Sequence, residues 1–372
     1  MTGSSGDTIT RIFVGAVSRE LDPPLSEGIG GRSSRDAVPV ESMVDPAGLE
    51  MVSLTSHAGR LRGAPPRRNN AVRNQSATGM LIGALILGCA AAESLAGDVT
   101  WNGPGGGDFN TGANWTPASG PGAGDTAVFN NLSQYASISF SSDAITAGAR
   151  FGGPILDWTP SLAIGPYTWT VTNDVLVSID ADKAGVPTLS SGTLAITNPW
   201  GAALLRVAPA GYGGFFINGG TAIVDNIVAT NPASGPNLWI NKGRLTSLGS
   251  TLISRPSDFQ INTYAYGEIA EWIMPSGVHT VLAVNGTAIA QTSDSTALVF
   301  VAGTETVWTN SGALGVGANG HGSLTITNGA RVYNTSANLG GTPGARGEVL
   351  ITGSTSLWEL VGDGRYLYVA GN

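Results

Sequence analysis

Histidine, the side chain best suited to acid–base chemistry near neutral pH, is scarce in this sequence. Only His279 and His321 occur beyond residue 97, and neither has an acidic residue or a cysteine near it in sequence. His321 lies in a glycine-rich loop whose counterpart one repeat later carries Arg346, so we expect an exposed corner residue. The sequence also contains no His-x-x-x-His pair, cysteine pair or nucleophile elbow beyond that point. The histidines therefore predict no metal site and no catalytic triad.

Clustered carboxylates offer another route to catalysis. Enzymes that cleave polysaccharides on a β-helix place Asp or Glu, often with Arg or Lys, on one parallel face. The best local candidate is Asp180 and Asp182 with Lys183, because residues two apart on a strand point the same way. Glu268 and Glu271 form a weaker pair. Such pairs also arise by chance on solvated surfaces, which is the interpretation we favour.

Metal and phosphate sites have little support either. Residues 108–112 resemble the start of a calcium loop, but a third acidic ligand and the closing glutamate are lacking. Residues 103–107 are rich in glycine without the Lys-Ser/Thr of a phosphate loop, so they predict a turn. We therefore expect no metal, no cofactor and no enzymatic activity.

Three aromatic residues recur at a fixed interval. Trp308, Tyr333 and Trp358 stand 25 residues apart, and each follows an apolar residue. If one coil of the fold takes 25 residues, the three rings form a column with a spacing of about 5 Å. We expect an internal ladder that stiffens the fold. The alternative is an exposed strip whose flat rings bind sugar rings.

The elements that would position these rings belong to a repeat. Gly322–Thr327 returns as Gly347–Thr352, and Leu314-Gly315 returns as Leu339-Gly340. The unit is rich in Gly, Thr, Val and Ile, and its apolar and polar residues alternate, which predicts strands rather than helices. A short fixed period indicates one unit stacked on its copies. We therefore predict an all-β protein, a parallel β-helix (β-solenoid) with about 25 residues per coil.

The repeat is regular in one part of the chain and loose in another. Residues 305–372 carry the regular repeats and stop within one, as expected for a truncated fragment of a longer protein. Residues 151–304 predict irregular coils, although Gly192–Asn198 echoes Gly322–Asn328 at a distance of 130 residues, near five coils. Residues 97–150 predict an N-terminal β module or cap. About eleven coils would fill residues 98–372.

An export signal precedes this region. Five arginines between residues 60 and 73 lead into the 12-residue apolar run 81–92, which is too short for a membrane span of about 20 residues. Ser94-Leu95-Ala96 fits a small-x-small cleavage site, so residues 80–96 predict the apolar core and cleavage region of a signal peptide. The alternatives are a buried helix, or a lipoprotein box that would make Cys89 a lipid anchor.

Residues 1–79 lie ahead of this signal. They are rich in Ser, Gly, Pro and Arg without a sustained period, so we expect a disordered leader. A signal normally begins a protein, so the true start could be Met51, with residues 1–50 an over-extended reading frame; the rival is a genuine long leader. The net charge of −8 falls within residues 98–372, which argues against nucleic acid or anionic lipid as partners.

Residues 305–372 resemble the short glycine-rich repeat of autotransporter passenger domains and of bacterial surface proteins that carry a PEP-CTERM sorting tail. The resemblance rests on Leu314–Gly329, Leu339–Gly353 and Ser356-Leu357-Trp358, and on the opening Trp101-Asn102-Gly103 with Asn114-Trp115. The translocator barrel and the sorting tail of those proteins are missing from this sequence. The resemblance implies a right-handed β-helix that is secreted or held at the bacterial cell surface or outer membrane, usually without enzymatic activity.

Together these patterns predict a structural or adhesive role, with polysaccharide or cell-surface components as partners. A carbohydrate-binding module and a β-helix polysaccharide lyase or hydrolase are the alternatives. Aromatic rings that face solvent would favour the binding module. A cluster of Asp and Arg on one face would favour the enzyme.

Overall fold

A computed structural model describes most of the chain beyond residue 96. The described residues are 97–103, 105–130, 135–153, 159–178, 184–208, 212–230, 238–263 and 267–369, together with the backbone of strand β1 (Ile9–Gly15). The predicted signal peptide, Cys89 and nearly all of the predicted leader lie outside these residues. About 1% of the structure is helical, a single 3-10 turn at Gly112–Asn114. No helix in the described part of the chain has the length and apolarity to cross a bilayer.

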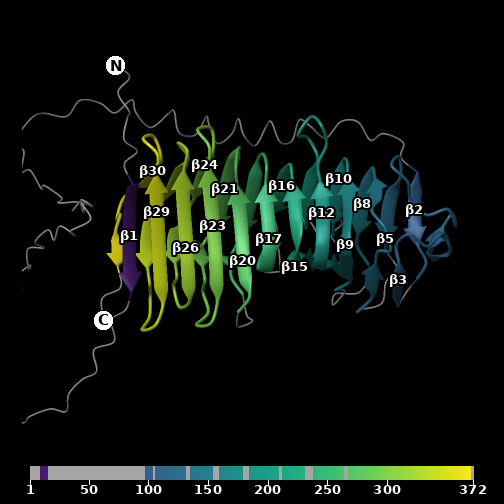
Figure 1. The fold of residues 1–372 in the computed structure, drawn as a ribbon, viewed down its shortest axis with the longest axis horizontal. Coiled ribbons are helices and arrows are strands. Elements are labelled where there is room, and N and C mark those ends of the chain that lie inside the picture. The colour runs from purple at the N-terminus through teal and green to yellow at the C-terminus, as the bar shows by residue number, and fades with distance from the viewer. Residues whose placement is uncertain are drawn as a thin grey trace, which may run out of the picture. The chain divides into compact units, whose positions relative to one another are not determined.

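The chain winds into a parallel β-solenoid of about nine turns with about 26 residues per coil, which confirms the predicted fold class. In Figure 1 the strands stand side by side in chain order from β2 to β30. Each coil near the C-terminus has three strands in succession, and we call the surfaces that they build the first, second and third faces. One such coil consists of β22 (Thr287–Ile289), β23 (Thr296–Ala302) and β24 (Val307–Asn310).

The first and second faces belong to one 17-stranded sheet. The later first-face strands are β19 (Phe259–Ile261), β22, β25 (Ala313–Val316), β28 (Ser336–Leu339) and β31 (Leu367–Val369). The later second-face strands are β20 (Ile269–Met274), β23, β26 (His321–Thr327) and β29 (Arg346–Thr352). Strand β1 pairs antiparallel with β29 through its backbone.

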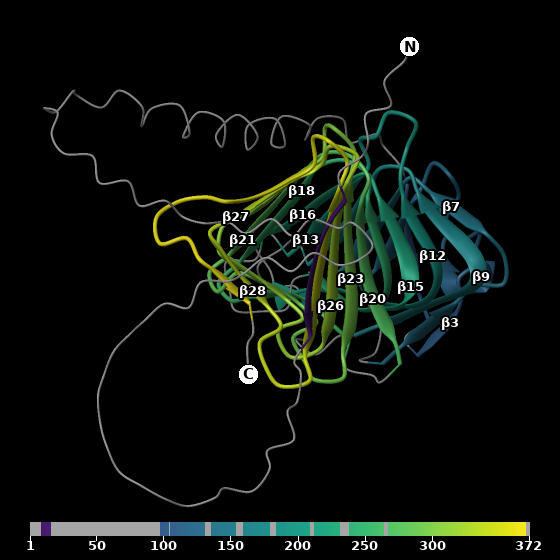
Figure 2. The same cartoon turned by 60° about the vertical axis from the view of Figure 1, so that its left-hand side comes forward.

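The third face is a 12-stranded sheet, parallel except for β4 (Trp115–Thr116). Its parallel strands are β2 (Asp98–Trp101), β5 (Thr126–Phe129), β8 (Gly148–Phe151), β10 (Asp174–Val177), β13 (Leu204–Val207), β16 (Asn226–Thr230), β18 (Thr251–Arg255), β21 (Val278–Ala283), β24, β27 (Arg331–Asn334) and β30 (Leu357–Leu360). Figure 2 shows β13, β16, β18 and β21 on one wall, across from β12, β15, β20 and β23 on another.

In the middle coils one long strand serves both the first and the second face. These strands are β9 (Ser161–Val171), β12 (Thr188–Ile196), β15 (Phe215–Val224) and β17 (Leu238–Ser247). Each turns the corner at a glycine. At Gly192 the φ angle is +76°, and an added Cβ would lie 2.6 Å from the Cβ of Ile164 in the coil before, so only glycine fits there. Strands β6 (Ser137–Ser139) and β7 (Ala144–Thr146) pair with the two halves of β9.

The opening coil packs around aromatic rings. Trp101 and Trp115 meet edge to face with ring centroids 4.8 Å apart, and both side chains are fully buried. Phe109 and Phe129 complete this cluster. Strand β3 (Gly106–Asp108) pairs with β6, and the two-residue strands β11 (Ala184–Gly185) and β14 (Tyr212–Gly213) form a small separate ladder. Parallel pairing thus begins with β2 and β5, within the segment predicted as a cap.

The register of the second face explains the echoes in the sequence. Leu324 pairs with Val349 and Ile326 with Ile351, in parallel, as predicted. One buried column runs up this face from coil to coil: Trp169, Leu194, Ala222, Leu245, Trp272, Val299, Leu324 and Val349. Leu194 and Leu324 are five coils apart in this column, so the echo at 130 residues reflects equivalent positions.

The first face keeps a different interval. Leu314 pairs with Ala337, and Leu339 pairs with Val316. The predicted equivalence of Leu314 and Leu339 is therefore wrong by two residues. The turns between strands differ in length, so a period that holds on one face need not hold on the next.

Candidate functional site

The predicted column of Trp308, Tyr333 and Trp358 does not form. Trp308 pairs with Val332, and Val332 pairs with Trp358, whereas Tyr333 pairs with Thr309 and Glu359. Trp308 is buried, while Tyr333 alternates with buried Val332 and Asn334 and points outward. A shift of one residue in register moves a side chain to the opposite face of a strand. The three residues are equally spaced in the sequence, but the strand that carries Tyr333 is shifted by one residue relative to the other two strands.

The inward rings form a cluster instead of a three-ring ladder. Trp272 packs edge to face against Phe259, Trp308 and His279, with ring centroids 5.6, 5.7 and 6.3 Å apart. Trp358 is partly buried, and its indole Nε1 donates a hydrogen bond to Asn334. These rings fill the interior where the faces meet, so they serve the fold rather than a ligand.

The two histidines are in unlike places. His279 is buried, with Nδ1 3.0 Å from the hydroxyl of Thr251 and Nε2 2.8 Å from the carbonyl oxygen of Ser276. Burial lowers the pKa of His279 to about 4, although the bond to Ser276 acts in the opposite direction. Neutral His279 is therefore a hydrogen-bonded core residue at neutral pH. His321 is exposed and pairs with Arg346 in the next coil, in agreement with the expected corner position.

The predicted carboxylates are engaged in ion pairs on the outside of the second face. Glu268 lies 3.5 Å from Lys242, and Glu271 pairs with Arg244. Asp180, Asp182 and Lys183 lie outside the described residues. Asp108 accepts hydrogen bonds from the backbone of Asn110 and the hydroxyls of Thr111 and Ser141, as in a closed turn. Within the described part of the chain no group of three or more His, Cys, Asp or Glu could hold a metal ion.

One place on the first face departs from regular pairing. Strand β17 pairs with β19 through Ile240 and Ile261 alone, whereas β15 and β17, on the other side, pair along most of their length. A pocket of about 280 Å³ opens between β17 and β19. We call it the β17–β19 slit. Its lining residues come from β17, the end of β18, the turn that follows β18, β19 and the residue after β19: Trp239, Ile240, Asn241, Arg255, Asp258, Gln260 and Asn262.

An aromatic platform borders this slit. Phe216 on β15 and Trp239 on β17 pair in register and face outward, each only half-buried. Their rings are stacked, with centroids 4.5 Å apart and planes 5° from parallel. Phe216 covers one face of the Trp239 indole and is not part of the slit lining. The slit therefore meets the surface of the indole that Phe216 leaves uncovered.

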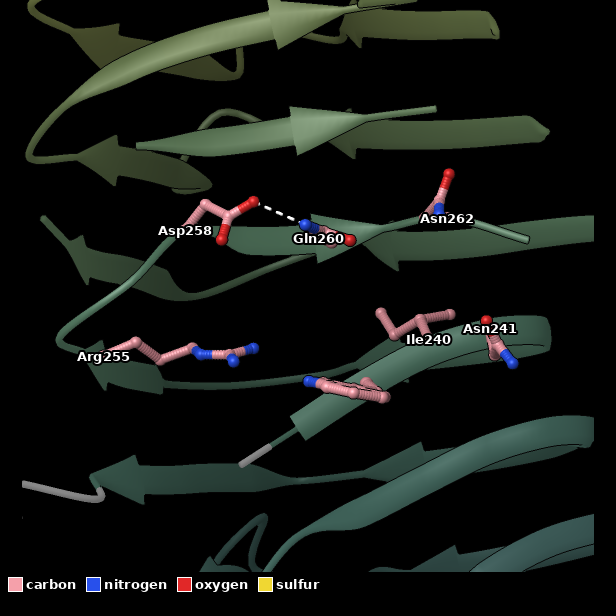
Figure 3. A pocket seen from close by; sticks show the side chains of 7 residues that line it. Ile240, Asn241, Arg255, Asp258, Gln260 and Asn262 are labelled. Carbon is pink, nitrogen blue, oxygen red and sulfur yellow. Dashed lines mark hydrogen bonds between the residues drawn. The ribbon is translucent and has the colours of Figure 1, made fainter. Parts of the chain in front are cut away.

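Polar side chains form the opposite wall, and Figure 3 shows Asp258, Gln260 and Asn262 following one strand above Ile240 and Asn241. Gln260 donates a hydrogen bond to Asp258. Arg255, at the end of β18, contributes a guanidinium to the same space. The slit thus offers a flat apolar surface on one side and both hydrogen-bond donors and acceptors on the other.

The side-chain amide of Asn262 has an orientation that is fixed by its hydrogen bonds. Its Oδ1 accepts hydrogen bonds from the backbone N–H groups of Gln291 and Thr292, at 2.9 and 3.1 Å, and from the Thr292 hydroxyl. These three donors fix the oxygen toward the next coil. The Nδ2 group is buried without a hydrogen-bond partner, in a residue only 2% exposed that lines the slit. A buried donor of this kind is costly unless something accepts its hydrogens.

No family model matches the chain. No curated protein and no solved structure matches it significantly either.

Sequence reasoning missed the slit. A signal for part of it was present, because Trp239 stands between Leu238 and Ile240, and strand alternation turns it outward if both aliphatic neighbours face the core. Nothing in the sequence shows that Phe216 is its partner. The pairing depends on the number of residues between Phe216 and Trp239, and the interval between paired residues varies from coil to coil.

Proposed function

We propose that this protein is an exported, non-enzymatic β-solenoid of the bacterial cell surface, with a structural or adhesive role, similar to autotransporter and PEP-CTERM passengers. The observation that carries this proposal is the continuous buried column of the second face, which joins successive coils into one stack. Such a stack presents long regular outer faces to partners. The basic flank, the apolar run 81–92 and Ser94-Leu95-Ala96 support export.

The ion pairs of the second face favour this role over polysaccharide cleavage. General acids and nucleophiles in glycosidases need a carboxylate partner at a defined distance and a shifted pKa. Glu268 and Glu271 each have a basic partner in the coil before, as ion pairs that brace neighbouring coils do. Carbohydrate binding has better support than cleavage, because the platform of Phe216 and Trp239 faces solvent.

Expression of the full chain in a Gram-negative host tests export. We expect the exported product to begin at Gly97 or Asp98 and to be found in the periplasmic fraction, outside the cytoplasm. Replacing Leu85 and Leu87 by aspartate should abolish export, because charges within the apolar run prevent its insertion. Cys89→Ser is the matched control and should leave cleavage after Ala96 unchanged. A product that keeps residues 51–96, or one that stays in the cytoplasm, would contradict the proposal.

A further inference from the structure

We propose that the β17–β19 slit binds a single neutral sugar ring, stacked on the indole of Trp239. This inference deepens the adhesive role proposed above by naming a class of ligand. It rests on that role in one respect, because the sugar is taken to be part of an extracellular glycan. The slit is distinct from the aromatic residues that recur every 25 positions, Trp308, Tyr333 and Trp358. It is carried by three features of the described residues: the opened pairing, the aromatic platform and the unsatisfied amide of Asn262.

The opened pairing makes room for a ring. On the first face, residues paired in register on neighbouring strands lie next to each other, and Phe216 and Trp239 stack in this way. Ile240 and Ile261 are the only residues that pair between β17 and β19. The residues before them are Trp239 and Gln260, so Gln260 is the counterpart of Trp239 in the next coil. The slit lies between these two positions. A flat ring that enters it would form the next layer of the stack after Phe216 and Trp239.

The volume of the slit limits the size of the ligand. At about 280 Å³ it is slightly smaller than the usual small-molecule pocket, whose volume range starts at roughly 300 Å³. One sugar ring, or one ring with part of its neighbour, fits such a space better than an extended stretch of chain. The structure therefore favours recognition of one residue of a glycan.

The polar wall suits hydroxyl groups. Each sugar hydroxyl donates one hydrogen bond and accepts others, so it pairs with both kinds of group. Asn262 supplies a buried donor that lacks an acceptor, and Asp258 supplies an acceptor beside the amide of Gln260. The one positive charge in the lining, Arg255, is matched by the one negative charge, Asp258. This balance favours a neutral sugar over a uronic acid.

Binding of methyl glycosides to the purified full chain tests the inference directly. The probes are the methyl glycosides of glucose, galactose, mannose and N-acetylglucosamine, with glucuronic acid as the charged comparison, read by saturation-transfer NMR and calorimetry. We expect at least one neutral glycoside to bind with an affinity typical of a single sugar, in the millimolar range. Trp239→Ala should weaken that binding by roughly tenfold or more, because the stacking surface is lost.

Two further variants separate the site from general effects. Asn262→Asp keeps the acceptor oxygen that holds Gln291 and Thr292 but replaces the free donor, so it should weaken binding. Because it also buries a carboxylate in a residue only 2% exposed, it should lower the thermal midpoint, and binding is compared below that midpoint. Trp200→Ala removes an indole that is 84% exposed and not part of the slit, and should leave binding unchanged.

Several results would overturn the inference: no glycoside binding to the wild-type chain, equal losses from Trp239→Ala and Trp200→Ala, or tighter binding of glucuronic acid than of every neutral sugar. These measurements on purified protein do not depend on export. Binding without export would refute only the proposed function, and export without binding would refute only this inference.

Discussion

Replacement of Trp272 by alanine is expected to lower the free energy of unfolding by about 3–5 kcal/mol, the range for buried tryptophan truncations. Trp272 is fully buried in the column of the second face, between Leu245 and Val299. Its indole Nε1 donates a hydrogen bond to Ser247, and its ring packs against the inward cluster. The neighbouring backbone is held by strand pairing on both sides, so the cavity cannot collapse.

Trp200→Ala is the matched control for this loss. The same residue type is removed from a turn where the ring is 84% exposed, so the cost should stay within about 0.5 kcal/mol. Urea unfolding followed by far-ultraviolet circular dichroism measures both variants. A loss for Trp272→Ala no larger than that for Trp200→Ala would mean that Trp272 does not occupy the core.

His279 should make the stability fall as the solution becomes acidic. Its folded-state pKa of about 4 lies below the unfolded value of 6.5, so the unfolded chain binds more protons between these two pH values. The contribution of neutral His279 is therefore complete above pH 6.5 and is lost as the pH falls toward 4. At the acid end of that pH window, this pKa shift lowers the free energy of unfolding by about 3 kcal/mol. The residues that contact its ring, Thr251, Ser276 and Trp272, do not titrate over this range.

The variant His279→Gln isolates this effect from the carboxylates, which titrate in the same acid range. Its stability should change less between pH 6.5 and 4 than that of the wild-type chain. Urea midpoints at several pH values provide the comparison. Parallel pH profiles for the two proteins would show that His279 is not buried in its neutral form.

The C-terminal part of the second face could be predicted from the sequence because paired residues are 25 positions apart in both steps from Val299 to Val349. Leu324 and Val349, in the same phase of the repeat, occupy neighbouring positions in one column. The third face could not be predicted in the same way. Tyr333 follows an apolar residue just as Trp308 does, yet a turn one residue shorter puts Val332 in the core beside Trp308. Strand alternation converts such a small difference into a change of face.

The β17–β19 slit could not be predicted from the sequence, for a different physical reason. Its residues come from two coils and a corner, and they meet because β17 and β19 pair at one position only. Local patterns predict that Trp239 faces outward, but they contain no information about how far two neighbouring strands separate. The buried amide of Asn262 is visible only once Gln291 and Thr292 of the next coil are in place.

Disulfide trapping across two coils tests the parallel in-register stack most directly. In the full chain with Cys89→Ser, the pair Thr309→Cys and Tyr333→Cys should close a disulfide on mild oxidation, because register partners on adjacent strands lie about 4.8 Å apart. The pair Val307→Cys and Tyr333→Cys also faces outward but is two residues out of register, about 8 Å apart, and should keep both thiols free. Thiol titration distinguishes the two states. Closure of the first pair alone is the predicted result; closure of the second pair in preference to the first would contradict the stack.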